Sequence, residues 1–534
     1  MKSERDPQRC PGARRSRRLL VLAGVILSAC SASGDGPAPG APRLVVLYST
    51  CTLTKEYLSP YHPEVEFTPN LQAFADEGLV FERHNTEAGQ SGVAFASIYT
   101  GVQADRHGVY HHPRHLPDSL YLATEAFRDG GYRPYFWSGQ PLASAELGYG
   151  QGVRDGDVYY THVMFTPQAK HLPEGFFTET TANGPELDAV LERLREHPQA
   201  GAFLQINFTI THELYHEYAN IEKVEAFRAA YPACAGDFSR EEIEEELALF
   251  EAHRHELQMD FPRAVERLGL DEADVRRLDA VLRLVYMTCV HQLDTYFGRF
   301  LDKIRAAGLL DESLIAFTAD HGETFYRPSE VFHWMHGLQL APSVIEVPLL
   351  LRAPGLGIRP GRYAAVTRSI DVFPTLAGLA GLKLPLDARL DGSDLSAAVL
   401  GERAAPELLA FSHTSTLGAP RVKRYRRDRL AMAEAVMPEP VPENMWVRVR
   451  AGDRIWQTSR VRPAEERTES FDLAADPGRT HDLFDPADEH DRDMAAKLAA
   501  YRRRLVDGFR DEEDMSQREI LDRLKGLGYV GGDR

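Results

Sequence analysis

Side chains able to bind a metal follow three of the predicted buried strands. Cys51 comes just after the first of these strands and His212 after the second, while Asp320 and His321 follow the third. The carboxyl ends of parallel strands lie at one edge of a sheet, where ligands collect, so we expect these side chains to share a site. Carboxylate and imidazole groups together bind divalent cations. An Asp-His-Gly sequence alone is more often structural; the shared edge favours a metal site.

A serine precedes a predicted helix in a position suited to anion chemistry. Ser91 lies in the glycine-containing loop 88–92, directly before a helical stretch that ends at Gly101. Free N–H groups and the helix dipole at a helix N-terminus favour an anion. Ser91 is therefore either a nucleophile facing an anionic substrate or a simple helix cap.

The elements that must position these side chains alternate between strands and helices. Apolar runs predict strands at 44–48, 78–81, 135–137, 202–208, 313–317 and 348–352, and periodic patterns predict helices at 68–75, 122–127, 187–194, 285–304 and 373–380. Such alternation predicts an α/β fold with helices on both faces of the sheet.

The C-terminal part has a different pattern. Short strands are expected near 408–412, 446–450 and 455–457, followed by a helix from about 489 to 509. The predicted organisation is a signal peptide at 1–29, a flexible tether at 30–43, a main α/β domain at 44–385 with an acidic helical insertion at 220–282, a small sheet subdomain at 386–488, and a helix and tail at 489–534.

The N-terminus has the pattern of an export signal. A cationic run is followed by a short apolar stretch that ends at Cys30. Charged and apolar segments of this length are typical of a secretory signal rather than of a membrane-spanning helix. Because Leu27-Ser28-Ala29-Cys30 resembles the bacterial lipobox, we expect lipidation at Cys30 and a body in the periplasm or at the cell surface. The alternative is an ordinary cleaved signal.

The composition argues against two classes of protein, nucleic-acid-binding proteins and disulfide scaffolds. With 61 Lys and Arg against 79 Asp and Glu, the net charge is −18, which argues against nucleic-acid binding. Five cysteines in 534 residues are too few for a disulfide scaffold. The composition is therefore that of a large folded protein, which is either an enzyme or a relative of one.

A series of short motifs runs through the chain in order. They include Thr68-Pro69-Asn70-Leu71, Arg106-His107-Gly108-Val109, Asp320-His321-Gly322-Glu323, Ile370-Asp371-Val372-Phe373-Pro374-Thr375-Leu376, Leu390-Asp391-Gly392-Ser393-Asp394-Leu395 and Phe471-Asp472-Leu473. Their types and order resemble the sulfatase family of the alkaline phosphatase superfamily, over roughly residues 44 to 532. The resemblance implies a central, mostly parallel sheet with helices on both faces and a small C-terminal α+β subdomain.

The resemblance also implies site residues. Ser91 falls on the family's nucleophile position, His212 on its strand-end histidine, and His336 where the family places a basic, anion-binding residue. Asp320 and His321 fall on a pair of metal ligands. The family's usual cation is calcium, and its substrates are sulfate or phosphate esters.

The sequence departs from the family pattern at two functional positions. Cys51 and Thr52 stand where the family has metal-binding aspartates. The stretch from Ser91 to Phe95 lacks the proline and arginine of the family's modification motif, so conversion to formylglycine is not expected.

Two functions follow from these departures. In the first, a hydrolase of sulfate or phosphate esters uses Ser91 directly, and Cys51 joins Asp320 and His321 in a site that selects zinc over calcium. In the second, an inactive sulfatase-fold lipoprotein binds a glycan, an anion or a partner protein, and Cys51 fills the pocket as a small apolar residue. The expected partners are a sulfated or phosphorylated small molecule or glycan, no nucleic acid, and a membrane through the N-terminal lipid only; oligomeric state is left open.

Overall fold

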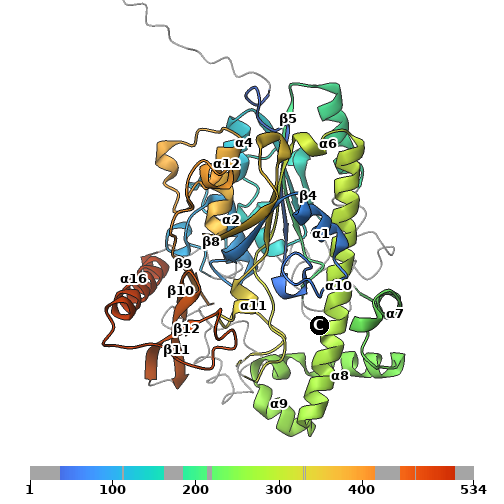
Figure 1. Ribbon diagram of the computed structural model, residues 1–534, viewed down its shortest axis with the longest axis vertical. Helices are drawn as coiled ribbons and strands as arrows, with labels where there is room; N and C mark the ends of the chain where they lie inside the picture. Colours follow the sequence, from blue (N-terminus) through green and yellow to red (C-terminus); the bar gives the residue numbers. More distant parts are fainter. Residues whose placement is uncertain are drawn as a thin grey trace, which may run out of the picture. The chain divides into compact units, whose positions relative to one another are not determined.

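The central sheet contains eight strands in the computed structural model, which describes residues 36–110, 114–160, 184–212, 219–328, 330, 332–414, 445–462 and 465–511. The strand order is β4-β3-β5-β1-β6-β7-β2-β8 (Figure 1). The bounds are β1 Leu44–Thr50, β2 Leu79–Asn85, β3 Tyr132–Ser138, β4 Val158–Tyr160, β5 Gly201–Phe208, β6 Ser313–Ala319, β7 Leu349–Arg352 and β8 Gly361–Arg368. Only β7 runs antiparallel to its neighbours in this sheet, which confirms the mostly parallel α/β fold.

The register of the three central strands brings their carboxyl ends level. Thr50, the last residue of β1, pairs with Phe208 of β5 on one side and with Ala319 of β6 on the other. The residues that follow these strands therefore leave the sheet side by side. This is the edge at which the sequence predicts the site.

Helices cover both faces of the sheet, as Figure 1 shows. One face packs against α1 Pro69–Asp76, α6 Pro185–Glu196 and α10 Glu272–Ala306, and the other against α2 Ser91–Thr100, α4 Ala123–Asp129 and α12 Val372–Leu379. Side chains of β1 alternate between the two cores: Tyr48 belongs to the first and Leu47 to the second. Burial on both faces explains why β1 is a continuous apolar run.

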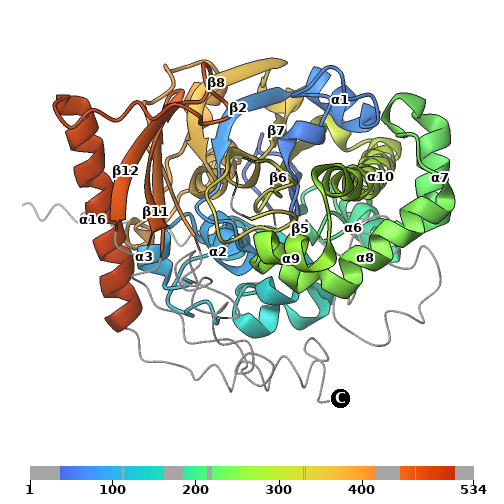
Figure 2. The same cartoon turned by 90° about the horizontal axis from the view of Figure 1, so that it is seen from below.

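Helices follow β5 in the region where the acidic insertion is expected. They are α7 Ile221–Ala230, α8 Arg240–Met259 and α9 Phe261–Leu268, and Figure 2 shows α8 and α9 beside α10. The helix expected from residue 285 begins earlier, at Glu272. A capping box between Asp271 and Asp274 satisfies the first N–H groups and explains the earlier start.

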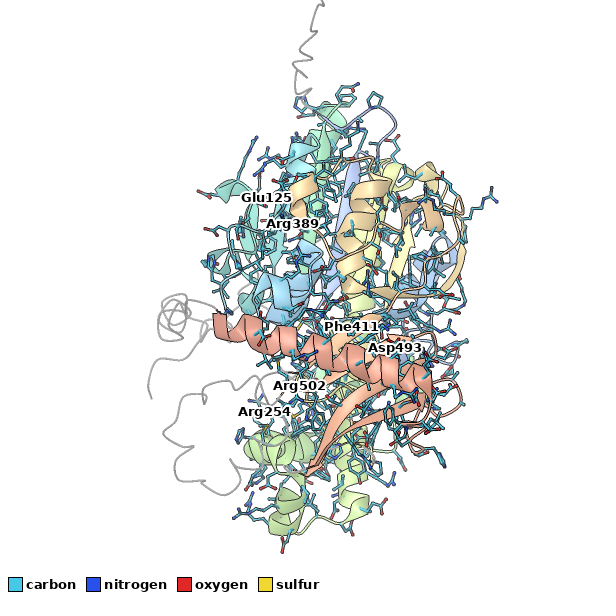
Figure 3. The ribbon with its side chains drawn as sticks, turned by 90° about the vertical axis from the view of Figure 1, so that its left-hand side faces the viewer. Glu125, Arg254, Arg389, Phe411, Asp493 and Arg502 are labelled. Atoms are coloured by element: carbon cyan, nitrogen blue, oxygen red, sulfur yellow. The ribbon has the colours of Figure 1, made fainter. Side chains whose placement is uncertain are left out.

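The small C-terminal sheet has the strand order β12-β11-β10-β9, and all its pairs are antiparallel. Its strands are β9 Ala410–His413, β10 Val447–Ala451, β11 Arg454–Arg462 and β12 Glu465–Asp472. The helix α16 Glu489–Asp511 lies across it, as Figure 3 shows with Asp493 and Arg502 on the helix. The ring of Phe411 on β9 lies 4.9 Å from that of Tyr501 on α16. Three further short α-helices are α3 Ala104–His107, α11 Pro342–Ile345 and α13 Ser396–Val399.

Several sequence predictions concern residues outside the described ranges. The signal peptide 1–29, the lipidation site Cys30, the first part of the tether and the tail beyond residue 511 are among them. The domain boundaries stay predictions. Within the described ranges, no helix combines the length and apolar character needed to cross a bilayer.

Candidate active site

The turn after β1 fixes the position of Cys51. Thr52 has a φ of 61°, in the left-handed region that residues other than glycine seldom adopt. Two hydrogen bonds hold this conformation: the Thr52 N–H donates to Asp320 Oδ1 at 2.9 Å, and the Tyr286 hydroxyl donates to the Thr52 carbonyl at 2.9 Å. The turn places the Cys51 side chain among the other strand-end residues.

Ser91 is the first residue of α2 and faces Cys51 and His321. Its Oγ lies 3.2 Å from Cys51 Sγ and 3.2 Å from His321 Nε2. The N-cap position belongs to Gln90, so the alternative interpretation of Ser91 as a simple helix cap is wrong. The serine hydroxyl instead points into the cluster at the sheet edge.

Asp320 and His321 leave β6 with different hydrogen-bond environments. Asp320 Oδ1 accepts from the backbone N–H of Thr52 at 2.9 Å and of His321 at 2.6 Å. Asp320 Oδ2 is buried, has no hydrogen-bond partner among the described residues, and lies 3.5 Å from His321 Nε2. His321 Nδ1 lies 3.0 Å from the Gly322 carbonyl, to which it donates. Its Nε2 is thereby left as an electron-pair donor facing Ser91.

Burial governs the charge of the cluster, since Cys51, Asp320 and His321 are fully buried. Burial raises the pKa of the Cys51 thiol well above its usual value, and the nearby Asp320 adds to the rise. Burial lowers the pKa of His321, which outweighs the opposing effect of Asp320. Around neutral pH the thiol is therefore protonated and the imidazole neutral, so neither of these two side chains brings a charge to the site.

The three predicted ligands fit a small divalent cation. One ligand atom each from Cys51, Asp320 and His321 lies within 4.8 Å of the other two. Asp320 Oδ2 is a buried carboxylate oxygen that no described residue meets with a hydrogen bond, the kind of atom that a cation would satisfy. A mixed sulfur, nitrogen and oxygen set is typical of zinc, whereas calcium takes six to eight oxygens. The residues present therefore fit the family's calcium poorly.

The other two predicted histidines lie at the same edge. The His336 ring lies 4.3 Å from that of His321 and 5.1 Å from that of His212. His336 Nδ1 is 3.4 Å from Glu323 Oε2, a fully buried carboxylate. The structure thus brings every predicted catalytic and metal residue together, while their individual roles stay predictions.

Glu56, the first acidic residue after Cys51, does not join the cluster. Its carboxylate oxygens lie 2.6 Å from the guanidinium of Arg327. Glu56 is therefore engaged in an ion pair and does not replace the ligand that Cys51 displaces.

Gln140 is a site residue that the sequence reasoning missed. Its Nε2 lies 3.3 Å from Cys51 Sγ and 3.2 Å from Ser91 Oγ, and its side chain is buried. Gln140 comes just after β3, so the strand-end rule that singled out Cys51 would also have found it.

A profile of the family described as Sulfatase matches residues 45–382. This chain belongs to the sulfatase family. Among curated sulfatases, it is 32% identical to arylsulfatase A of Bos taurus over 203 residues, which cover 37% of this chain and 38% of that protein. It is 24% identical to steryl-sulfatase of Mus musculus over 548 residues, covering 91% of this chain and 86% of that one. The match thus spans little more than a third of arylsulfatase A.

Solved structures extend the likeness of this sulfatase-family chain to the whole fold. A protein solved in complex with its substrate D-glucosamine-2-N,6-O-disulfate superposes with a TM-score of 0.61 at 16% identity, covering 89% of this chain and 100% of that one. The phosphonate monoester hydrolase of Agrobacterium radiobacter superposes with a TM-score of 0.55 at 20% identity, covering 89% of this chain and 97% of that one. Both superpositions show that these proteins share the fold of this chain.

Proposed function

We propose that this sulfatase-family chain hydrolyses sulfate esters with the Ser91 hydroxyl itself as nucleophile. The observation that carries the proposal is the placement of Ser91 Oγ at the start of α2, 3.2 Å from both His321 Nε2 and Cys51 Sγ. The family and its curated sulfatases support the reaction class. The substrate would be a sulfated small molecule or glycan, with phosphate esters as the related class.

Cys51, Asp320 and His321 would hold the metal ion, with zinc favoured by their donor atoms. When bound, that ion would supply the positive charge that makes a serine hydroxyl more acidic and neutralises an ester oxygen. The short distances among the three side chains support this assignment, and so does Asp320 Oδ2, which has no hydrogen-bond partner in the described part of the chain.

The chain's own residues supply the remaining chemistry. The Ser91 proton would pass to solvent water while Oγ forms a bond to sulfur and the ester oxygen–sulfur bond breaks, so that the alcohol leaves and a sulfoserine remains. Water would then attack that sulfur and break its bond to Ser91 Oγ, which releases sulfate and restores the hydroxyl. The N–H groups at the start of α2 would stabilise the anionic oxygens. His336, whose ring lies 4.3 Å from that of His321, would give the departing alcohol oxygen its proton.

Turnover by a serine variant tests this function. Purified protein supplied with zinc is assayed with 4-nitrophenyl sulfate, 4-nitrophenyl phosphate and bis(4-nitrophenyl) phosphate. We expect sulfate release that falls at least about 10³-fold in Ser91→Ala. An unchanged rate in that variant would contradict the proposal.

A competing function is an inactive, sulfatase-fold binding protein. It is favoured by the neutral, fully buried Cys51 thiol, which packs against Ser91 as a small side chain would. Absence of turnover with every ester, together with absence of metal binding, would support this alternative.

We also propose that the chain is exported and anchored through a lipid on Cys30. The basic and apolar N-terminal pattern that ends at this cysteine supports the proposal. Membrane fractionation tests it: the wild-type chain should sediment with membranes, and Cys30→Ala should release it. Equal distribution of the two would contradict the anchor.

A further inference from the structure

We propose that Gln140 is a catalytic residue that holds the Ser91 oxygen, and that Asn207 is the residue that positions Gln140. Both side chains are buried at the carboxyl edge of the central sheet. This inference rests on the proposed hydrolysis of sulfate esters. One of the experiments therefore measures the reactivity of Ser91 without ester turnover.

The amide of Gln140 can only donate at the end that faces Ser91. Gln140 Nε2 lies 3.2 Å from Ser91 Oγ and 3.3 Å from Cys51 Sγ, so its two N–H groups have two acceptors. Gln140 Oε1 accepts from the backbone N–H of Leu142 at 3.2 Å. The Leu142 N–H sets which end of the amide is oxygen, and the nitrogen end is thereby directed at the nucleophile.

This direction matters because negative charge develops on Ser91 Oγ when its proton is removed, and again when Oγ leaves sulfur as the sulfoserine is cleaved. A hydrogen bond to an ionised oxygen is roughly twice as strong as one to a neutral oxygen. The Gln140 donor therefore stabilises the transition state more than the resting hydroxyl, which is the condition for a catalytic contribution. It also leaves the Ser91 proton free to be directed elsewhere in the cluster.

Asn207 holds the loop that carries Gln140. Its Oδ1 accepts from the backbone N–H of Gly139 at 2.9 Å, from that of Gln140 at 3.0 Å and from the Ser138 hydroxyl at 3.2 Å. Its Nδ2 donates to the Tyr99 hydroxyl at 3.2 Å. Since Tyr99 belongs to α2, Asn207 connects the helix that begins with Ser91 to the loop that begins with Gly139.

Kinetics of substituted enzymes test the two roles. Gln140→Met keeps the size of the side chain and removes its donors; we expect kcat to fall about 100-fold, as for loss of one oxyanion donor, with KM changed less than about threefold. Gln151 lies outside the cluster and donates to the Gly148 carbonyl at 2.9 Å, so Gln151→Met is the matched control and should keep the wild-type kcat. An unchanged kcat in Gln140→Met, or a loss that only follows a lower unfolding temperature, would overturn the proposal.

Single and double variants test whether Asn207 acts through Gln140. Asn207→Ala should lower kcat as much as Gln140→Met, and the double variant should be no slower than either single one, because both changes remove the same contact. Asn207→Asp retains the accepting oxygen and should recover most of the rate. Additive losses would show that Asn207 acts only through stability.

Covalent labelling separates this proposal from the proposed function. A fluorophosphonate probe reports Ser91 reactivity without ester turnover, and mass spectrometry of the peptide locates the label. We expect labelling at Ser91 in wild type and at least about tenfold slower labelling in Gln140→Met. Equal rates, or no label on Ser91 in wild type, would overturn the role of Gln140 whether or not the chain hydrolyses sulfate esters.

Discussion

Two buried carboxylates near the carboxyl edge of the sheet have opposite surroundings. Glu346 lies 2.8 Å from Lys55 Nζ, 2.9 Å from Arg450 Nη1 and 3.5 Å from Arg448 Nη2. Burial alone would raise the pKa of Glu346, but these cations outweigh it and hold that pKa well below its usual range. The chain itself therefore compensates this buried charge.

Asp320 receives no such compensation from the described part of the chain. Its Oδ1 accepts two backbone hydrogen bonds, and its Oδ2 lies 3.5 Å from Nε2 of His321, an imidazole whose pKa burial lowers. A buried charge without a partner costs several kcal/mol, and stability alone would not retain it. We propose on this contrast that Glu346 serves stability, whereas Asp320 serves a bound cation.

The largest expected effect on stability comes from removing the compensated carboxylate. Glu346→Gln removes the carboxylate that faces the partly buried Lys55 and the buried Arg448 and Arg450, so we expect the free energy of unfolding to fall by about 3–5 kcal/mol. Because the depressed pKa contributes stability above pH 4 or so, the difference from wild type should shrink as pH falls below that value. Urea denaturation at pH 7 and at pH 3.5 measures both effects.

The control is Glu272→Gln, which breaks an exposed ion pair with Arg276 within α10. Exposed pairs contribute little, so this change should shift the unfolding midpoint far less. If Glu346→Gln were as mild as the control, the cations around Glu346 would not be stabilising it.

A third buried carboxyl group, that of Glu87, is expected to be protonated and therefore neutral in the folded protein below about pH 8. Burial raises the pKa of Glu87 to about 8, and it lies on the loop before Ser91. A carboxyl whose pKa is higher in the folded than in the unfolded state makes stability fall as pH rises from about 4.5 to about 8. Glu87→Gln should therefore stabilise the protein by a few kcal/mol at pH 8 and by little at pH 5.

Thermal unfolding across that pH range measures the effect of Glu87→Gln. The amide keeps the oxygen that accepts from the Ile370 N–H at 3.3 Å, so packing is nearly preserved. A wild-type profile that is flat between pH 5 and pH 8 would show that Glu87 ionises freely in the folded state.

The smallest expected effect on stability comes from Asp320→Asn in the metal-free protein. The amide oxygen still accepts from the Thr52 and His321 N–H groups, and the uncompensated charge is removed. We expect the free energy of unfolding to change by less than about 1 kcal/mol, or to rise. A loss as large as that of Glu346→Gln would mean that the two carboxylates do not differ as proposed.

The sequence predicted the fold better than the details of the site. The apolar runs located β1, β5 and β6 because these strands are buried on both faces. The strand β8 was missed because its residues alternate irregularly between exposed and buried, and the antiparallel direction of β7 has no sequence signal.

At the site, sequence reasoning found the residues with distinctive chemistry. Cys51, Ser91 and His321 were singled out because thiol, hydroxyl and imidazole groups stood at strand or helix ends. Gln140 also follows a strand, β3, but it was missed because only strand-end residues with ionisable or metal-binding groups were singled out. Glu346 pairs with arginines on β10 that lie more than 100 residues from it in the sequence. Only the folded structure shows this pairing.

Calorimetric titration of the metal-free protein with zinc, and separately with calcium, tests the central claim most directly. We predict one zinc ion per chain, with affinity at least about 100-fold weaker in Cys51→Ala, since a ligand should matter at least as much as the groups that orient ligands. Cys289→Ala, a change at a buried cysteine of α10, should leave the affinity unchanged. Calcium bound as tightly as zinc, or zinc bound equally by wild type and Cys51→Ala, would contradict the assignment of Cys51, Asp320 and His321 as a zinc site.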